Sequence, residues 1–127
     1  MKLLVDTHAF IWGYSDRKKL SAKAAAALSD PKNQAYLSAA STWEIALKMT
    51  RGNLSLPEPL GMMMAGLEEG GLAHLPITWQ HAVMVQSLPL HHRDPFDRML
   101  AAQALVEGLT LVSADKAFKK YGVPLLW

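Results

Sequence analysis

Short apolar runs of strand length alternate along the chain with longer stretches in which apolar residues recur at helical spacing. The first run, residues 2–5, stops at Asp6 and is followed by apolar residues at 9–12 without strict alternation. This order predicts a strand and then a helix. Four further strands are predicted, at 35–37, 72–77, 109–112 and 123–126.

Capping residues and helix breakers define the helices between these strands. Ser21 precedes an alanine-rich stretch, a composition that favours a helix. Ser41 is predicted to cap the next helix, with Glu44 three residues later as its partner in a capping box. Asp94 and Pro95 form a typical helix start. The predicted helices cover residues 9–12, 22–28, 41–49, 59–69, 78–88, 96–107 and 114–120.

Strands that alternate with helices predict right-handed crossovers and a mostly parallel sheet covered on both faces. The expected fold class is therefore α/β, a three-layer α/β/α sandwich, formed as one domain over residues 1–127. In such a sheet the functional crevice lies beyond the carboxyl ends of the strands. Asp6 and Asp115 both follow predicted strands of this kind.

Composition narrows the function classes. The chain has no cysteine, which excludes disulfides, thiolate nucleophiles and cysteine-based metal sites and leaves His, Asp and Glu as ligands. No apolar stretch approaches the ~20 residues that cross a bilayer, and the first residues lack a signal-peptide pattern. We expect a cytoplasmic protein without a membrane partner. The net charge of +2 permits a polyanionic partner without requiring one.

Four acidic residues fall at strand-to-helix junctions or in first helical turns: Asp6, Glu44, Asp97 and Asp115. Carboxylates gathered at one edge of a sheet repel one another unless a proton or a cation bridges them. Hard carboxylate oxygens suit Mg²⁺ or Mn²⁺, which also bind phosphate oxygens. The pattern thus points to phosphodiester chemistry. The structural alternative is that each acid only caps a helix or complements its dipole.

Four segments carry a resemblance to a known family: LLVDTH at 3–8, STWEI at 41–45, HHRDPFDR at 91–98 and LVSAD at 111–115. Together they resemble a PIN domain, and more narrowly a VapC-type toxin of a type II toxin–antitoxin pair. The resemblance runs through the whole chain in the family's order. It implies a PIN-like α/β/α fold, in agreement with the architecture predicted above.

The resemblance also implies the site. Asp6, Glu44, Asp97 and Asp115 match the family's four acidic positions, which hold one or two Mg²⁺ or Mn²⁺ ions, and Thr7 and Ser113 match supporting hydroxyls. The implied protein is an endoribonuclease that hydrolyses RNA with metal-activated water. The implied partners are an RNA substrate, a cognate antitoxin and a second copy in a homodimer. Two alternatives remain: a structure-selective DNA nuclease on the same fold, and a non-catalytic nucleic-acid-binding module.

Other features are open to two interpretations. Arg98 is the preferred candidate for a phosphate contact among several basic residues. His8, His91 and His92 fit either the site or solvated positions. The run Met62–Met64 is either core packing or an adaptable apolar surface that grips the antitoxin.

Overall fold

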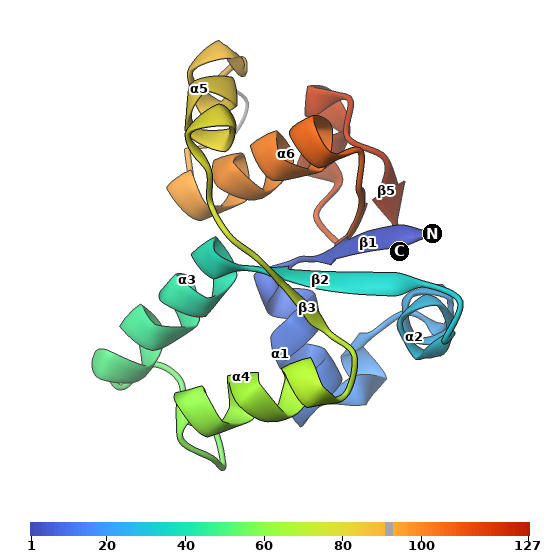
Figure 1. The fold of residues 1–127 in the computed structure, drawn as a ribbon, viewed down its shortest axis with the longest axis vertical. Coiled ribbons are helices and arrows are strands. Elements are labelled where there is room, and N and C mark those ends of the chain that lie inside the picture. The colour runs from blue at the N-terminus through green and yellow to red at the C-terminus, as the bar shows by residue number, and fades with distance from the viewer. Residues whose placement is uncertain (91–92) are drawn as a thin grey trace.

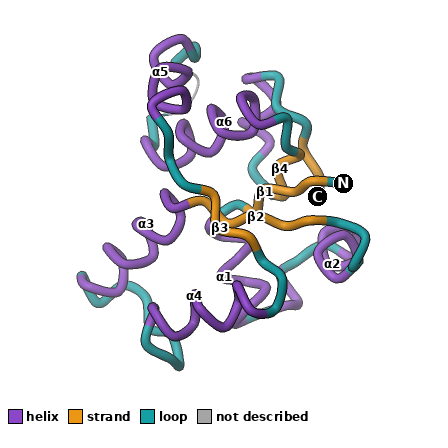
Figure 2. Tube along the Cα trace, viewed as in Figure 1, coloured by secondary structure: helices purple, strands orange, loops and turns teal. Residues whose placement is uncertain are grey.

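The fold was analysed in a computed structural model that describes residues 1–90 and 93–127. Its centre is a sheet of five parallel strands in the order β3-β2-β1-β4-β5 (Figures 1 and 2). The strands are β1 Lys2–Val5, β2 Gln34–Ser38, β3 Ala73–Leu75, β4 Thr110–Val112 and β5 Leu125–Leu126. β1 is therefore central, with β2 on one side and β4 on the other.

Helices cover both faces of this sheet. The α-helices are α1 Thr7–Ser15, α2 Ala22–Ser29, α3 Ala39–Thr50, α4 Leu60–Glu69, α5 Trp79–Ser87 and α6 Pro95–Glu107; two 3₁₀ helices are η1 Arg17–Lys19 and η2 Lys116–Tyr121. Figure 1 shows α1, α3 and α4 below the sheet and α5 and α6 above it. The chain steps from β1 to β3 in one direction and then crosses to β4 beyond β1, so right-handed connections place the later helices on the opposite face. The predicted three-layer α/β/α sandwich is confirmed.

The strand pleat sends neighbouring side chains into separate cores. Leu4 of β1 packs in a cluster with Leu100 of α6 and Phe118 of η2, whereas Val5 packs with Phe10 and Ile45 on the face of α1 and α3. All of these side chains are buried. A strand buried on both faces explains the continuous apolar run at the start of the sequence.

The start of α3 corrects one prediction. Ser38, not Ser41, is the N-cap, because its side chain accepts the Ala40 N–H at 3.0 Å. The helix follows β2 without a loop, so Ser41 lies inside the first turn and its hydroxyl accepts from Thr7 at 2.8 Å. The predicted capping box between Ser41 and Glu44 is therefore wrong, and Glu44 lies a turn further along the helix than a capping role requires.

Other boundaries follow the sequence more closely. Ser21 and Asp94 cap helices at the predicted starts, and Pro95 occupies the first turn of α6. Thr78, the first residue of a predicted helix, is the N-cap of α5. The short helix predicted over 114–120 is a 3₁₀ helix that begins at Lys116, with Asp115 as its cap. None of the helices in the described part of the chain is long and apolar enough to span a bilayer.

The methionine run of α4 divides between core and surface. Met63 is 3% exposed and Met64 is 9% exposed, and both pack against the α1 and α3 side of the sheet. Met62 is 65% exposed. Of the two interpretations of this run, core packing is confirmed for Met63 and Met64, because the helix turns these two side chains toward the sheet, and only Met62 fits the surface interpretation.

This division predicts unequal effects on stability. Met63→Ala should lower the free energy of unfolding by about 2–5 kcal/mol, since it leaves a cavity in a packed core. Met62→Ala, the same change one position earlier, should alter it by less than about 0.5 kcal/mol. Urea unfolding followed by circular dichroism measures both. Equal losses would show that Met63 is not a core residue.

Candidate functional site

The candidate site lies where the order of the strands reverses. The chain leaves β1 toward β2, and later enters β4 on the other side of β1. Open parallel sheets bind ligands at the carboxyl ends of the strands that flank such a point. Asp6 directly follows β1, its N–H donates to the Val112 carbonyl at 3.0 Å, and Ser113 directly follows β4.

Asp6 is held rigidly at this edge. It is the N-cap of α1, where one carboxylate oxygen accepts the His8 N–H at 3.1 Å. The Ser113 hydroxyl donates to the other oxygen. The residue is only 5% exposed. Among the residues that the structure describes, each oxygen therefore accepts one hydrogen bond and keeps a second lone pair.

Burial raises the pKa of the Asp6 carboxyl above its ordinary value, because a carboxylate removed from water loses solvation. The hydrogen bonds from Ser113 and from the His8 N–H lower this pKa, as does the positive charge of the His8 ring. The negative charge of Glu44 raises it further. Asp6 thus responds to the Glu44 carboxylate although the two residues are far apart in sequence.

Asp115 joins Asp6 through a serine. The Asp115 N–H donates to the Ser113 hydroxyl oxygen at 3.0 Å, and that hydroxyl in turn donates to Asp6. The Asp115 side chain caps η2 by accepting the Ala117 N–H at 2.9 Å. A cavity of about 330 Å³ opens over this group and is lined by Asp6, His8, Trp12, Ala114 and Asp115.

Glu44 reaches the site from the other side of β1, where β2 lies. It lies on α3, which follows β2, and the Thr7–Ser41 hydrogen bond fixes the first turn of α3 against the start of α1. The Glu44 side chain is 8% exposed, and Lys48 lies 3.1 Å from its Oε2 atom. Its Oε1 atom is buried and has no hydrogen-bond partner among the described residues. A buried carboxylate oxygen without a hydrogen bond lowers the stability of the fold unless a ligand binds it.

Asp97 approaches from the opposite helical layer. It occupies the third position of α6, where its N–H donates to Asp94 at 3.2 Å. The preceding residue, Phe96, packs edge to face against Trp43 of α3, with ring centroids 5.1 Å apart. This contact brings the start of α6, and with it Asp97, beside the helix that carries Glu44.

The structure therefore links Asp6 to two of the other three predicted acids. Asp6 is coupled to Glu44 by charge and to Asp115 through Ser113. Within residues 1–90 and 93–127, no three His, Asp or Glu side chains form a ready-made metal cage. A magnesium ion needs only one or two protein carboxylates and keeps several waters. The buried Asp6 and the unpaired Glu44 oxygen fit that requirement.

The basic candidates take different positions. The Arg98 guanidinium donates to the carbonyls of Pro89 and Val85 at 3.0 Å and to that of Leu88 at 3.3 Å. These bonds tie α6 to the end of α5 and favour a structural role over the predicted phosphate contact. Lys48 is the partner of Glu44, which the Glu-to-Lys spacing of four residues on a helix could have revealed. His91 and His92 lie outside the described residues.

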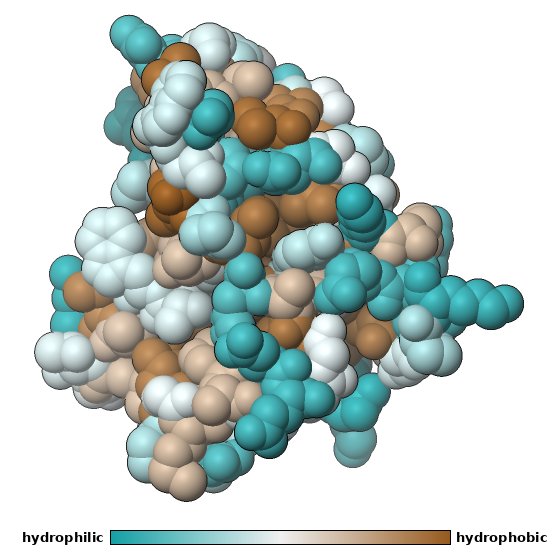
Figure 3. Space-filling view, viewed as in Figure 1, coloured by the Kyte–Doolittle hydropathy of each residue, from teal (hydrophilic) through white to brown (hydrophobic). Residues whose placement is uncertain are grey.

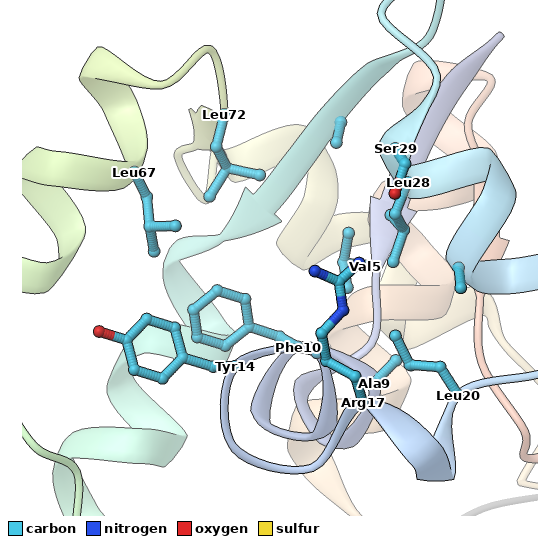
Figure 4. Close-up of a pocket in the computed structure, with 13 residues that line it drawn as sticks. Val5, Ala9, Phe10, Tyr14, Arg17, Leu20, Leu28, Ser29, Leu67 and Leu72 are labelled. Atoms are coloured by element: carbon cyan, nitrogen blue, oxygen red, sulfur yellow. The ribbon is translucent and has the colours of Figure 1, made fainter.

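A second cavity, of about 320 Å³, lies away from the acids (Figure 4). Its walls are mainly apolar side chains of α1, α2 and α4, among them Phe10, Leu28 and Leu67, with Arg17 of η1 extending across it. None of the four predicted acids lines it. The cavity beside Asp6, which two of the predicted acids line, is therefore the chemically relevant one.

Comparison with known families identifies the fold. The family model of the PIN domain matches residues 3–124, nearly the whole chain. The chain belongs to the PIN-domain family. The resemblance found in the sequence motifs is thereby confirmed.

Solved structures agree with this assignment at the level of the fold. VapBC2 of Rickettsia felis bound to a promoter DNA fragment matches with a TM-score of 0.74 and 14% identity, covering 98% of this chain and 97% of that chain. DNA-bound VapBC of Salmonella typhimurium matches with a TM-score of 0.69 and 18% identity, covering 98% of this chain and 96% of that chain. FitAcB of Neisseria gonorrhoeae matches with a TM-score of 0.64 and 19% identity, covering 97% of this chain and 95% of that chain. No curated protein sequence matches the chain.

The raised pKa of Asp6 predicts a stability effect. The folded state binds the Asp6 proton more tightly than the unfolded chain does, so ionisation of Asp6 destabilises the fold as pH rises above the ordinary value of 3.8. Asp6→Asn removes this charge and keeps an equally good helix cap. In the presence of a chelator, the variant should have a higher thermal midpoint than the original chain at pH 7.

The difference between the two midpoints should shrink as the pH approaches 4, where Asp6 is increasingly protonated in both states. Thermal unfolding followed by circular dichroism at pH 4, 5.5 and 7 measures it. A variant that is less stable at pH 7 would contradict the conclusion that burial of the charge dominates at this position.

Proposed function

We propose that this PIN-domain chain is a Mg²⁺- or Mn²⁺-dependent endoribonuclease and the toxin component of a type II toxin–antitoxin module. One observation carries the proposal. The buried Glu44 Oε1 atom has no protein partner within the described residues, and the charge of Glu44 raises the pKa of the buried Asp6 at the strand-order reversal. A divalent cation relieves the repulsion and satisfies the oxygen.

The residues divide into ligands and supports. Asp6 and Glu44 are the proposed direct ligands, with Asp97 and Asp115 contributing directly or through water. Ser113 fixes the Asp6 carboxylate by donating to it, and Thr7 fixes the helix of Glu44 through Ser41. Side chains locked in this way hold ligands in a constant geometry.

A bound Mg²⁺ or Mn²⁺ supplies hydroxide from water near neutral pH and neutralises negative charge on a phosphodiester. The chain's own contribution is to hold the acids in a fixed orientation. Hydrogen bonds from Ser113 and the His8 N–H favour the charged form of Asp6, against the effect of burial. Asp115, beside Asp6 in the same cavity, is placed to orient a water molecule as general base.

The rival readings differ in what the acids are for. A non-catalytic nucleic-acid-binding module needs the acids only as helix caps. Asp6 and Asp115 do cap α1 and η2, but Glu44 caps nothing and is buried. That position supports a ligand role. A DNA nuclease would use the same acids, so only the choice of substrate distinguishes the two nuclease hypotheses.

An antitoxin partner is proposed from the surface of α3 and α4. Two large apolar side chains, Trp43 and Met62, are 59% and 65% exposed there. Between the helices lies a groove of about 630 Å³ lined in part by Ala46, Gly61 and Met64. In Figure 3 the surface over α3 and α4 is mainly neutral to hydrophobic. Exposed apolar area of this kind marks protein interfaces.

A homodimer is also proposed. The exposed Trp79 and Val83 of α5, at 72% and 56%, offer an apolar surface for a second copy on the other helical layer.

Cleavage of RNA tests the nuclease proposal. The purified chain should cleave total cellular RNA in the presence of Mg²⁺ and not with a chelator, giving ends that can be mapped. Asp6→Asn should reduce the rate at least about 100-fold, because even groups that only orient a metal ligand typically contribute 10–100-fold. Quantified cleavage over time is the measurement.

Asp30→Asn is the matched control. Asp30 is exposed and precedes β2, at the opposite edge of the sheet, so its loss should leave the rate unchanged. Cleavage by folded Asp6→Asn at the original rate would refute the site. Cleavage of single-stranded DNA but not RNA would favour the DNA nuclease instead.

The antitoxin surface makes a separate prediction. Met62→Asp places a charge on the apolar surface of α4 and should weaken capture of the co-expressed cognate antitoxin by about tenfold or more, equivalent to about 1.4 kcal/mol. Val106→Asp, on α6 in the opposite helical layer, should leave capture unchanged. Undiminished binding by Met62→Asp would remove this surface from the interface.

A further inference from the structure

Lys48 forms an ion pair with Glu44, one of the proposed metal ligands. They lie four residues apart on α3, with the Lys48 Nζ atom 3.1 Å from Glu44 Oε2. The Lys48 side chain is 33% exposed, whereas that of Glu44 is 8% exposed. Solvent-exposed ion pairs at this spacing contribute little to the stability of a protein. The burial of Glu44 sets this pair apart, because its carboxylate has lost most of its contact with water.

The ion pair makes the two oxygens of Glu44 unequal. Oε2 is occupied by the Lys48 ammonium, while Oε1 is buried without a hydrogen-bond partner among the residues described. A carboxylate can offer a cation one oxygen or both. The Lys48 ammonium, unlike the neutral donors to Asp6, repels a second cation at the oxygen it contacts, so Glu44 offers mainly Oε1.

The number of oxygens offered matters for the choice of cation. Ca²⁺ takes six to eight oxygen ligands in flexible geometry and often binds both oxygens of a carboxylate, whereas Mg²⁺ requires a near-ideal octahedron. We propose that Lys48 is a metal-selectivity residue that, by occupying Oε2, restricts Glu44 to single-oxygen contact and so disfavours Ca²⁺ relative to Mn²⁺ and Mg²⁺. This inference rests on the proposed function.

A simpler effect of Lys48 has a different signature. Its positive charge opposes every divalent cation to a similar extent, since the Coulomb energy depends on charge and distance. Restriction of Glu44 to one oxygen instead penalises the cation that gains from the second oxygen. The ratio of Ca²⁺ to Mn²⁺ affinity therefore separates the two effects, whereas either affinity alone does not.

Calorimetric titration of the full chain with MnCl₂ and with CaCl₂ provides the test. In Lys48→Met the Ca²⁺ affinity should rise relative to the Mn²⁺ affinity by about tenfold or more, within the range by which groups beside a metal ligand alter affinity. Lys48→Ala, which also removes the ammonium, is the second variant in case the first does not fold. Lys23→Met, an identical change at an exposed position of α2, should leave the ratio unchanged.

An equal rise in both affinities would overturn the proposal, since it would show an effect of charge alone. An unchanged ratio in a folded variant would also overturn it. A chain with native Lys48 that binds neither cation would instead contradict the proposed function, and the selectivity role with it. Binding of Mn²⁺ by the original chain, combined with a shifted ratio in the variants, is the expected result.

Discussion

The structure depends on one unfavourable arrangement, a carboxylate buried at the end of the central strand. Asp6 follows β1 directly, and burial makes its charged form costly, with Glu44 adding like-charge repulsion. Two donors, the Ser113 hydroxyl and the His8 N–H, offset part of this cost. The neighbouring strands and helices hold Ser113, Glu44 and the start of α6 in fixed positions relative to the Asp6 carboxylate.

These elements come from three directions and are fixed by different forces. Ser113 is positioned by the backbone ladder between β1 and β4, in which Val5 pairs with Val112. Glu44 is positioned by the hydroxyl pair of Thr7 and Ser41. The start of α6 is positioned by packing of Phe96 on Trp43. The contacts that position these elements are thus made by residues other than the predicted acids.

The sequence predicted the fold well because the fold follows from local signals. Strand-length apolar runs, the helix starts at Ser21 and Asp94, and Pro95 all act within a few residues, and the structure confirms them. The α3 cap was misplaced because Ser38 and Ser41 satisfy the same local pattern. Only the end of β2 at Ser38 and the distant Thr7 decide between them.

Properties that depend on tertiary neighbours were harder to predict. Nothing in the methionine run distinguishes buried Met63 from exposed Met62, because the residues that bury Met63 lie on other elements. Arg98 looked like a free cation, yet its donors are taken by the carbonyls at the end of α5. Asp6 and Asp115 could be placed together from the sequence because the carboxyl ends of neighbouring parallel strands meet at one edge of the sheet.

The choice between helix cap and metal ligand, which the sequence leaves open for each acid, is not a true alternative at Asp6. Capping uses one lone pair of one oxygen, and the Ser113 bond uses one of the other. The remaining lone pairs point away from these donors and are available to a cation. Capping therefore supports ligation, because it fixes the carboxylate before a ligand arrives and removes the entropy cost of ordering it. Glu44, which caps nothing, gains the same rigidity from burial and from Lys48.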